Sequence, residues 1–472
     1  MSYDSQIGDA LTARQLTEWP LSKILQSSPG KIIHILFYLL FILVPLIFLP
    51  STSELFEFNK IIVTYILTTL IVSVWAIRCI VEKKFIFRRT ILDIPLLIFL
   101  ASSILSLLGS IDMHTSWFGY YSRWNGGLLS LISYSLLYWA FVSNMDRKSA
   151  LRTTHYALLT SIAVAIYAAL EHFGYSISCL LTTGSFNVAC WVQDVQNRVF
   201  ATLGQPNWLA AYLVALIFIP LVQLTSRSPL FDKERGNKGV SYWTNIGFFI
   251  LLFSTLLFTK SRSGLLAFAV SSAVFWLPQL KKHFKPFLIL NSLLLILVLI
   301  VPNPLRDLVL KTKDQRPTAN QGTSLETGGT ESGSIRKIVW TGATRIWTSS
   351  IKNLIIGTGP ETFAMAYYQY RPIEHNQTSE WELLYNKAHN EFLNYLATTG
   401  LLGFTSYLIL LISMAWVFIK NSPNTAYRTL NIALLAGWLT ISVTNFWGFS
   451  VVIMQLFLFL FPAIVITLED DK

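Results

Sequence analysis

One histidine has the sequence neighbours of a catalytic group. His389 lies in the stretch NKAHNEF, where a polar segment gives way to a sequence typical of a helix start. Imidazole is the side chain whose ordinary pKa suits proton transfer near neutral pH. A lone histidine is more often a surface or hydrogen-bonding residue, so the position alone leaves both roles open.

Basic residues recur close to the ends of long apolar stretches. A charge at a membrane boundary costs free energy unless it reaches the lipid headgroups or meets a partner. Any one of them could simply reach the headgroups, but several together indicate an anion site. Arginine suits a lipid-linked phosphate or diphosphate because it offers paired donors. The residues are Lys60, Arg123, Arg198, Lys260 and Arg262.

The elements that must position these residues are apolar helices. The chain has 472 residues, of which 53% are hydrophobic and 13% charged. That charged fraction is about half the ~25% of soluble proteins, and the apolar runs are long enough to cross a hydrocarbon core. The sequence therefore predicts an all-α polytopic membrane protein in contact with membrane lipids. The net charge of +11 would suggest a nucleic-acid partner in a soluble chain, but here membrane topology explains it and we expect no nucleic acid.

About twelve transmembrane helices are predicted. The segment before the first one lacks the features of a cleaved signal peptide, so the first helix should remain as an anchor. The predicted domains are a cytoplasmic N-terminal segment 1–30, nine helices in 31–301, an extracytoplasmic loop 302–400, three helices in 401–468 and a cytoplasmic tail 469–472. The helices are expected at 32–49, 61–81, 91–108, 126–142, 154–173, 207–224, 242–258, 264–277, 286–301, 401–419, 429–446 and 449–468.

The distribution of Lys and Arg predicts the orientation. An even number of spans puts both termini on one side, and the basic loops mark the cytoplasmic side. The short loops on the side of the termini carry most of the loop Lys and Arg. We therefore expect cytoplasmic termini and an extracytoplasmic loop 302–390, with the boundary residues Lys60, Arg123, Arg198, Lys260 and Arg262 on the outer side.

The long loop has two parts. Residues 306–333 are rich in Thr, Gly, Gln and Ser, which predicts a mobile segment. From Ile335 an amphipathic pattern with Arg336 predicts a helix that either lies on the membrane surface or packs over the helical bundle. The sequence GTGPETF ends it, with Pro360 opening the next helix. Arg336 and Arg371 are further basic candidates in this loop.

Other catalytic patterns are missing from the sequence. It contains neither HExxH nor GxSxG, and no histidine pair has zinc-ligand spacing, so we expect no metal site. Cys179 and Cys190 share one predicted outer loop. A disulfide between them is possible in an oxidising compartment.

Several motifs together resemble the O-antigen ligase and polymerase superfamily of bacterial membrane glycosyltransferases. They occur in the family's order, around the long outer loop. One departure is Asn386-Lys387 before Ala388-His389, where Asp-Arg would be expected. The motifs are FEFNK, GYYSRWNG, NRVFATLGQPNWLAAYL, KSRSG, RKIVW, GTGPETF and KAHNEFLNYLATTGLLG.

The resemblance implies a type C glycosyltransferase-like enzyme of the bacterial cytoplasmic (inner) membrane. Such enzymes move a glycan from a polyprenyl (undecaprenyl) diphosphate carrier to an acceptor hydroxyl on the outer face, and neither cofactor nor metal is implied. His389 would orient or deprotonate the acceptor, and Arg262 and Arg123, with Arg198, Lys60 and Lys260, would hold the diphosphate. Arg336 and Arg371 would contact phosphate or glycan. Asn207 would orient a ligand or cap a helix.

Three functions are consistent with the sequence. A ligase would transfer the glycan to a lipid or protein acceptor, as in lipopolysaccharide biosynthesis or protein O-oligosaccharyl transfer. A polymerase would use another lipid-linked glycan as acceptor, with the same chemistry. A transporter of lipid-linked sugars is less expected, because the sequence shows no clear repeated halves and few charges inside the predicted spans.

Overall fold

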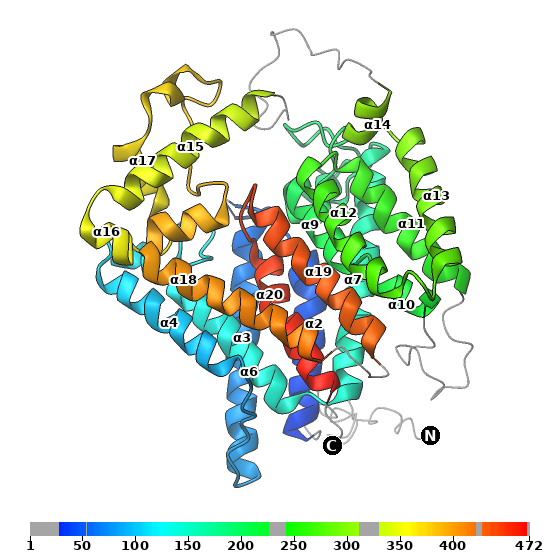
Figure 1. The fold of residues 1–472 in the computed structure, drawn as a ribbon, viewed down its shortest axis with the longest axis horizontal. Helices are drawn as coiled ribbons and strands as arrows, with labels where there is room; N and C mark the ends of the chain where they lie inside the picture. The colour runs from blue at the N-terminus through cyan, green and yellow to red at the C-terminus, as the bar shows by residue number, and fades with distance from the viewer. Residues whose placement is uncertain (1–27, 53, 226–241, 311–329, 422–426, 470–472) are drawn as a thin grey trace, which may run out of the picture.

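The protein is built from helices joined by turns and loops (Figure 1). The structure is a computed structural model that describes residues 28–52, 54–225, 242–310, 330–421 and 427–469. These described ranges contain no β-strand, which confirms the predicted all-α class. The predicted mobile segment lies outside the described residues from 311 to 329, and its start is helical in α14 (Pro304–Val309).

Each of the twelve apolar stretches predicted from the sequence coincides with helical structure. The stretch predicted at 207–224 is two helices, because Pro220 lacks an N–H to bond the carbonyl of Leu216. The long helices are α2 (Pro29–Leu46), α3 (Glu57–Val81), α4 (Asp93–Leu108), α6 (Leu128–Asn144), α7 (Arg147–His172), α9 (Pro206–Leu216) with α10 (Ile219–Thr225), α11 (Tyr242–Phe258), α12 (Arg262–Trp276), α13 (Phe284–Ile300), α18 (Glu391–Lys420), α19 (Arg428–Asn445) and α20 (Val452–Leu468).

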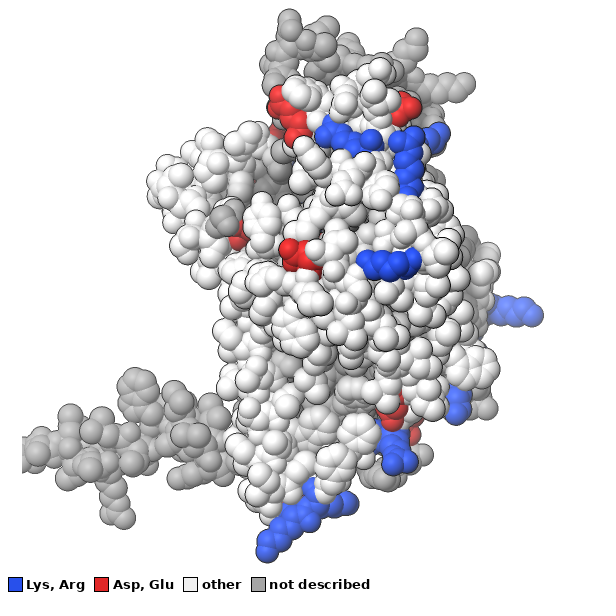
Figure 2. Space-filling model, turned by 90° about the vertical axis from the view of Figure 1, so that its left-hand side faces the viewer, with Lys and Arg blue, Asp and Glu red and all other residues white. Residues whose placement is uncertain are grey.

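Four of the described helices, namely α2, α3, α7 and α18, are by themselves long and apolar enough to cross a membrane. Six further apolar helices are shorter. Figure 2 shows few charged side chains across the middle of one side of the molecule, with mostly Lys and Arg towards the lower end and charges of both signs at the upper end. This is the surface of a membrane-integrated protein. The number of crossings stays a prediction.

The core of the bundle is α20, which is buried along its whole length. Its sequence is apolar on every face, as expected for a helix surrounded by others. It contacts α6, α7, α18 and α19, and it lies at the centre of the molecule in Figure 1. Because α20 is fixed from all sides, the loop that precedes it, residues 446–451, is held in place as well.

The long loop folds into a compact layer of short helices. These are α15 (Thr330–Thr348), α16 (Ile351–Ile356), α17 (Phe363–Tyr370) and η5 (Ile373–Gln377). The apolar face of α15 packs against Phe363 and Tyr367 of α17 and against Ala388 and Ala397. Protein therefore covers this face, as in the packing alternative for the amphipathic helix. α15 and α17 lie at the end of the molecule opposite to that where α2 begins and α20 ends (Figure 1).

Two glycines join this layer to α18. Gly400 has φ 64° and ψ −167° and kinks α18, and Gly357 has φ 73°. A Cβ on Gly357 would lie 2.2 Å from the carbonyl oxygen of Thr398, so only glycine fits this contact. The N–H of Gly359 donates to the same carbonyl at 2.8 Å. The GTGPETF turn is thereby fixed against the first turns of α18, which directly follow His389.

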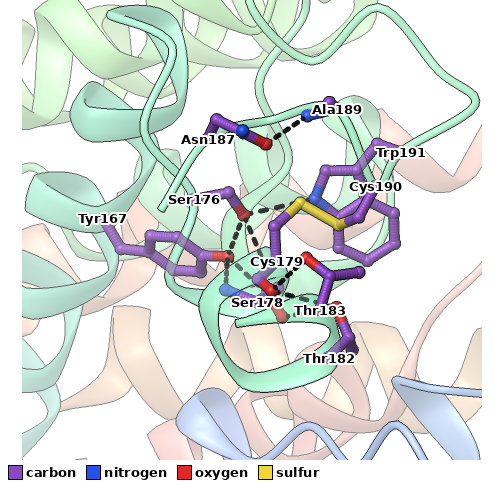
Figure 3. The surroundings of a disulfide bond; sticks show 10 residues. All are labelled: Tyr167, Ser176, Ser178, Cys179, Thr182, Thr183, Asn187, Ala189, Cys190 and Trp191. Carbon is purple, nitrogen blue, oxygen red and sulfur yellow. Dashed lines mark hydrogen bonds between the residues drawn. A yellow bond between two sulfur atoms is a disulfide. The ribbon is translucent and has the colours of Figure 1, made fainter. Parts of the chain in front are cut away.

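A disulfide joins Cys179 and Cys190, as the sequence allowed. Ser176 caps α8 (Ile177–Thr183) by accepting from the N–H of Cys179 at 3.3 Å, and it also accepts from Trp191 Nε1 at 3.3 Å (Figure 3). Further along the loop, the N–H groups of residues 200 and 201 donate to Oε2 of Glu171, near the end of α7. These bonds anchor the segment that leads through η2 (Ala201–Leu203) to the start of α9.

Candidate active site

A polar cavity lies between the start of α9, α15, the loop before α18 and the loop before α20. We call it the His389 cavity. Two of the predicted site residues besides His389, Arg336 and Asn207, line it together. Its other polar lining residues are Gln205, Ser263, Thr444 and Asn445.

Arg123 lies beside this cavity, in the loop between α5 (Met113–Phe118) and α6. Its guanidinium carbon is 5.2 Å from the ring centre of Trp208 and 5.0 Å from that of Phe449, and both rings line the His389 cavity. The Nη1 atom of Arg123 is buried and has no hydrogen-bond partner among the described residues. A buried guanidinium donor without a partner is costly unless a ligand meets it.

His389 is held by aromatic contacts in a left-handed backbone conformation, with φ 51°. Its ring meets Tyr385 at 5.1 Å and Phe449 at 5.5 Å between ring centres, edge to face in both cases. Asn390 caps α18 by accepting from the N–H of Leu393 at 3.1 Å. The predicted helix start directly after His389 is therefore confirmed.

The surroundings of His389 keep its imidazole neutral. Its pKa is lowered from 6.5 to about 3, mainly by burial and also by the positive charges of Arg336 and Arg123. Both cations are thus close enough to His389 to interact with it. A neutral imidazole between two cations can accept a proton once an anion offsets their charge.

Asn207 lines the His389 cavity from the start of α9. Its Oδ1 accepts a hydrogen bond from Ser261 Oγ at 2.7 Å, and Ser261 in turn caps α12. The N-cap residue of α9 is Gln205, so the capping alternative for Asn207 is wrong. Asn207 instead joins the KSRSG turn to the cavity wall.

The other predicted site residues do not line this cavity. Lys60 is fully buried, and its Nζ donates to the carbonyl of Thr202 at 2.7 Å and of Ile47 at 3.1 Å. Its ammonium therefore joins α3 to the end of α2 and to η2. Arg262, the first residue of α12, is exposed to the surroundings, although its neighbour Ser263 lines the cavity.

The remaining three basic candidates contact nearby loops. Lys260 Nζ donates to Asn197 Oδ1, and Arg198 Nε donates to the carbonyl of Thr259 at 3.4 Å. These two bonds join the 190s loop to the KSRSG turn. Arg371 donates to the carbonyl of Trp381, within the loop layer. The structure therefore brings Arg123, Arg336, Asn207 and His389 together and leaves the other five predicted residues outside the cavity.

A second polar cavity adjoins the first, and sequence reasoning missed it. We call it the Glu361 cavity; Glu361, Lys387 and Glu391 line it. Glu361 lies in the GTGPETF turn with φ 62° and forms an ion pair with Lys387. Lys387 also lies 5.7 Å from the ring centre of Phe449, the residue that contacts His389. The signal available in the sequence was a charged residue in each of two loop motifs, Glu361 in GTGPETF and Lys387 two residues before His389.

Lys387 also explains the departure noted in the KAHNEF motif. The sequence has Asn386-Lys387 where Asp-Arg was expected, yet Lys387 is 8% exposed and its charge is paired with Glu361. The positive charge at this position is therefore retained. Among the described residues, no group of three or more His, Cys, Asp and Glu side chains could hold a metal ion.

Arg123 and Arg336 can bind an anion, and the neighbouring imidazole of His389 can accept a proton. Residues 247–408 match the family model described as O-antigen ligase. The matched segment contains Arg336, Glu361 and His389, whereas Arg123 and Asn207 precede it. No curated protein matches the sequence. The family match over this segment confirms the resemblance to the O-antigen ligase superfamily.

Proposed function

We propose that this protein transfers a glycan from a polyprenyl diphosphate carrier to an acceptor hydroxyl. Its superfamily implies a glycosyltransferase-type membrane enzyme acting on a lipid-linked glycan. The observation that carries the proposal is the buried Nη1 of Arg123, which has no partner among the described residues, next to the neutral imidazole of His389. The transfer requires one group that binds the anionic leaving group and another that accepts the proton of the acceptor hydroxyl.

Arg123 and Arg336 would hold the diphosphate. The rings of Trp208 and Phe449 fix the guanidinium plane of Arg123, so its donors are oriented before the ligand arrives. Guanidinium groups pair with phosphate oxygens through two parallel hydrogen bonds. Fixed positive charge near the departing diphosphate stabilises the negative charge that develops on it, which is often the largest contribution to such catalysis.

His389 would take the proton of the acceptor. The acceptor oxygen forms a bond to the anomeric carbon while the bond from that carbon to the diphosphate oxygen breaks. The diphosphate leaves with the electron pair, and the acceptor proton moves to the imidazole. In the free protein the pKa of His389 is lowered to about 3. A bound diphosphate would offset the charges of Arg123 and Arg336 and so raise that pKa towards the range of a useful base.

The reaction would take place at the outer face of the cytoplasmic membrane. Arg336 of α15 lines the His389 cavity, and α15 lies at the end of the molecule away from the start of α2 (Figure 1). The Cys179–Cys190 disulfide belongs to the predicted outer side, and disulfides persist in oxidising compartments. Both observations support the predicted orientation with cytoplasmic termini.

The orientation can be tested by labelling with an impermeant thiol reagent in intact spheroplasts. The background is Cys79→Ser, which removes the free cysteine, and the probe is Gln377→Cys, at an exposed site in the loop layer. We expect labelling without membrane disruption. Lys83→Cys, exposed at the end of α3, is the matched control and should react only after disruption. The reverse result would contradict the orientation.

Ligase and polymerase differ in the acceptor, and one experiment separates them. The purified protein is incubated with a polyprenyl-diphosphate-linked glycan and with candidate acceptors, and the products are followed. A ladder of glycan lengths indicates a polymerase, and one modified acceptor indicates a ligase. If no acceptor is modified and the lipid-linked glycan only crosses vesicle membranes, the protein is a transporter and the proposed function is wrong.

A further inference from the structure

The Glu361 cavity holds hydrogen-bond acceptors that no described residue uses. Glu361 is 5% exposed and Glu391 is 4% exposed, and both line this cavity. The Oε2 atoms of both carboxylates are buried without a hydrogen-bond partner among the described residues. Buried carboxylate oxygens without donors are unfavourable, and two of them at one cavity point to a ligand that donates hydrogen bonds.

The surrounding groups determine what kind of ligand fits. Lys387 supplies one positive charge to two carboxylates, and its ammonium is paired with Glu361. The charged residues that line the cavity therefore leave no net positive charge to attract a phosphate. Asn125 and Asn394, together with the hydroxyl of Ser450 and the amide of Gln455, add neutral donors and acceptors around the carboxylates. Neutral hydroxyl groups, as on a sugar ring, match this set.

The position of the cavity relates it to the transfer reaction. Phe449 contacts His389 and Lys387, at 5.5 Å and 5.7 Å from its ring centre, and so lies between the two cavities. Phe449 lines the His389 cavity, while the next residue, Ser450, lines the Glu361 cavity. A ring bound by its hydroxyls at Glu361 can present another hydroxyl towards His389.

We propose that the Glu361 cavity is the sugar subsite for the acceptor, in which the Oε2 atoms of Glu361 and Glu391, which no described residue contacts by a hydrogen bond, accept hydrogen bonds from acceptor hydroxyls. This inference rests on the proposed transfer function. The two cavities then divide the reactants by charge. The His389 cavity, lined by Arg336 and adjoined by Arg123, receives the diphosphate of the donor, and the Glu361 cavity receives a neutral sugar. The acceptor is accordingly a glycan rather than a peptide hydroxyl.

The test measures the KM values for acceptor and donor separately, with full-length purified protein. The donor is a polyprenyl-diphosphate-linked glycan. The acceptors are the same lipid-linked glycan, a core oligosaccharide on lipid A, and a serine-containing peptide. Glu361→Gln and Glu391→Gln replace an accepting oxygen by a donating amide nitrogen. Each should raise the KM for the acceptor by about ten-fold or more and leave the KM for the donor within about two-fold.

Control variants keep the result interpretable. Glu82→Gln removes an exposed carboxylate directly after α3, whose Oε1 lies 2.6 Å from Nε of Arg78. This variant should leave the KM values for acceptor and donor unchanged. If a glutamate variant does not fold, Gln455→Leu tests the same cavity, because it removes an uncharged amide of similar size. It should also raise the acceptor KM selectively, by a smaller factor.

Two kinds of result overturn the subsite and leave the proposed function intact. The first concerns the cavity variants: their KM for the acceptor is unchanged, or their KM values for acceptor and donor rise equally. The second concerns the unaltered protein: it transfers glycan to the peptide alone. If the unaltered protein transfers glycan to none of the acceptors, the proposed function fails first and the subsite falls with it.

Discussion

Lys60 and Arg123 are equivalent candidates in the sequence, and they differ in how their buried donor atoms are used. The ammonium of Lys60 donates to main-chain carbonyls of Ile47 and Thr202, whereas Nη1 of Arg123 has no partner among the described residues. A buried cation with its donors occupied joins helices together. A buried cation that keeps a free donor, fixed between two rings, is available to a ligand. Lys60 therefore has a structural role and Arg123 a binding role, although both are basic residues near the end of a predicted span.

The largest effect is expected for His389→Ala. Loss of a positioned proton acceptor typically lowers the rate by about 10²–10⁴-fold. Transfer of glycan by the purified variant should fall by that factor, while its melting temperature in detergent stays within a few degrees of the original. Full transfer activity in a folded His389→Ala protein would remove His389 from the reaction.

Arg123→Gln tests the binding half of the comparison. Removing one donor aimed at developing charge typically costs about 10²–10³-fold in rate, so transfer should drop by that factor. The fold should persist, because the described residues provide no hydrogen bond to the buried Nη1. The variant is compared with Lys337→Gln, an exposed neighbour of Arg336 on α15. Equal activity of the two variants would contradict the role of Arg123.

Lys60→Met tests the structural half. The change leaves the buried carbonyl of Thr202 without its donor, at a cost of about 1–3 kcal/mol, and the part-buried carbonyl of Ile47 without its donor at a smaller cost. We expect a clearly lower melting temperature in detergent. The protein that remains folded should still bind the donor. A Lys60→Met protein of unchanged stability that no longer binds the donor would reverse the assignment of the two cations.

Arg262→Ala should have a smaller effect. The sequence predicted a catalytic role for Arg262, but its side chain is exposed and does not line the His389 cavity. An exposed charge contributes less to a binding site than a buried one. The expected loss of transfer is below about ten-fold. A loss as large as that of Arg123→Gln would mean that Arg262 enters the site when substrate binds.

The smallest expected effect is on the pH dependence of stability. The pKa of His389 is about 3 in the folded protein, against 6.5 for an ordinary histidine. The unfolded chain therefore takes up a proton between these values that the folded protein does not, and stability falls as the pH drops below about 6.5. His389→Asn removes this contribution. Its melting temperature should fall less between pH 7 and pH 5 than that of the unaltered protein; parallel curves would contradict it.

The sequence predicted the helical elements well because each apolar stretch is long and continuous. The helix start after His389 was also readable, since Asn390 and Glu391 are typical of a first turn. The site was less predictable, because a basic residue at a span end looks the same whether its donors are used or free. Whether the ammonium of Lys60 donates to main-chain carbonyls depends on residues far along the chain, such as Thr202.

The Glu361 cavity was missed for a related reason. Glu361, Lys387 and Glu391 are charged residues in a predicted loop layer, where charges are expected to be exposed. Their burial follows from the contact between the GTGPETF turn and α18, which the two glycines Gly357 and Gly400 permit. That contact has no local sequence signal beyond the glycines themselves.

The most direct test of the account is the dissociation constant for the donor lipid. Binding of a polyprenyl-diphosphate-linked glycan to the purified protein is measured for the unaltered chain, Arg123→Gln and Lys337→Gln, without acceptor. We predict that Arg123→Gln weakens binding by about ten-fold or more, because it removes a charge-assisted bidentate contact, whereas Lys337→Gln leaves binding unchanged. Equal dissociation constants for all three proteins would contradict the claim that the cavity between Arg123, Arg336 and His389 receives the diphosphate.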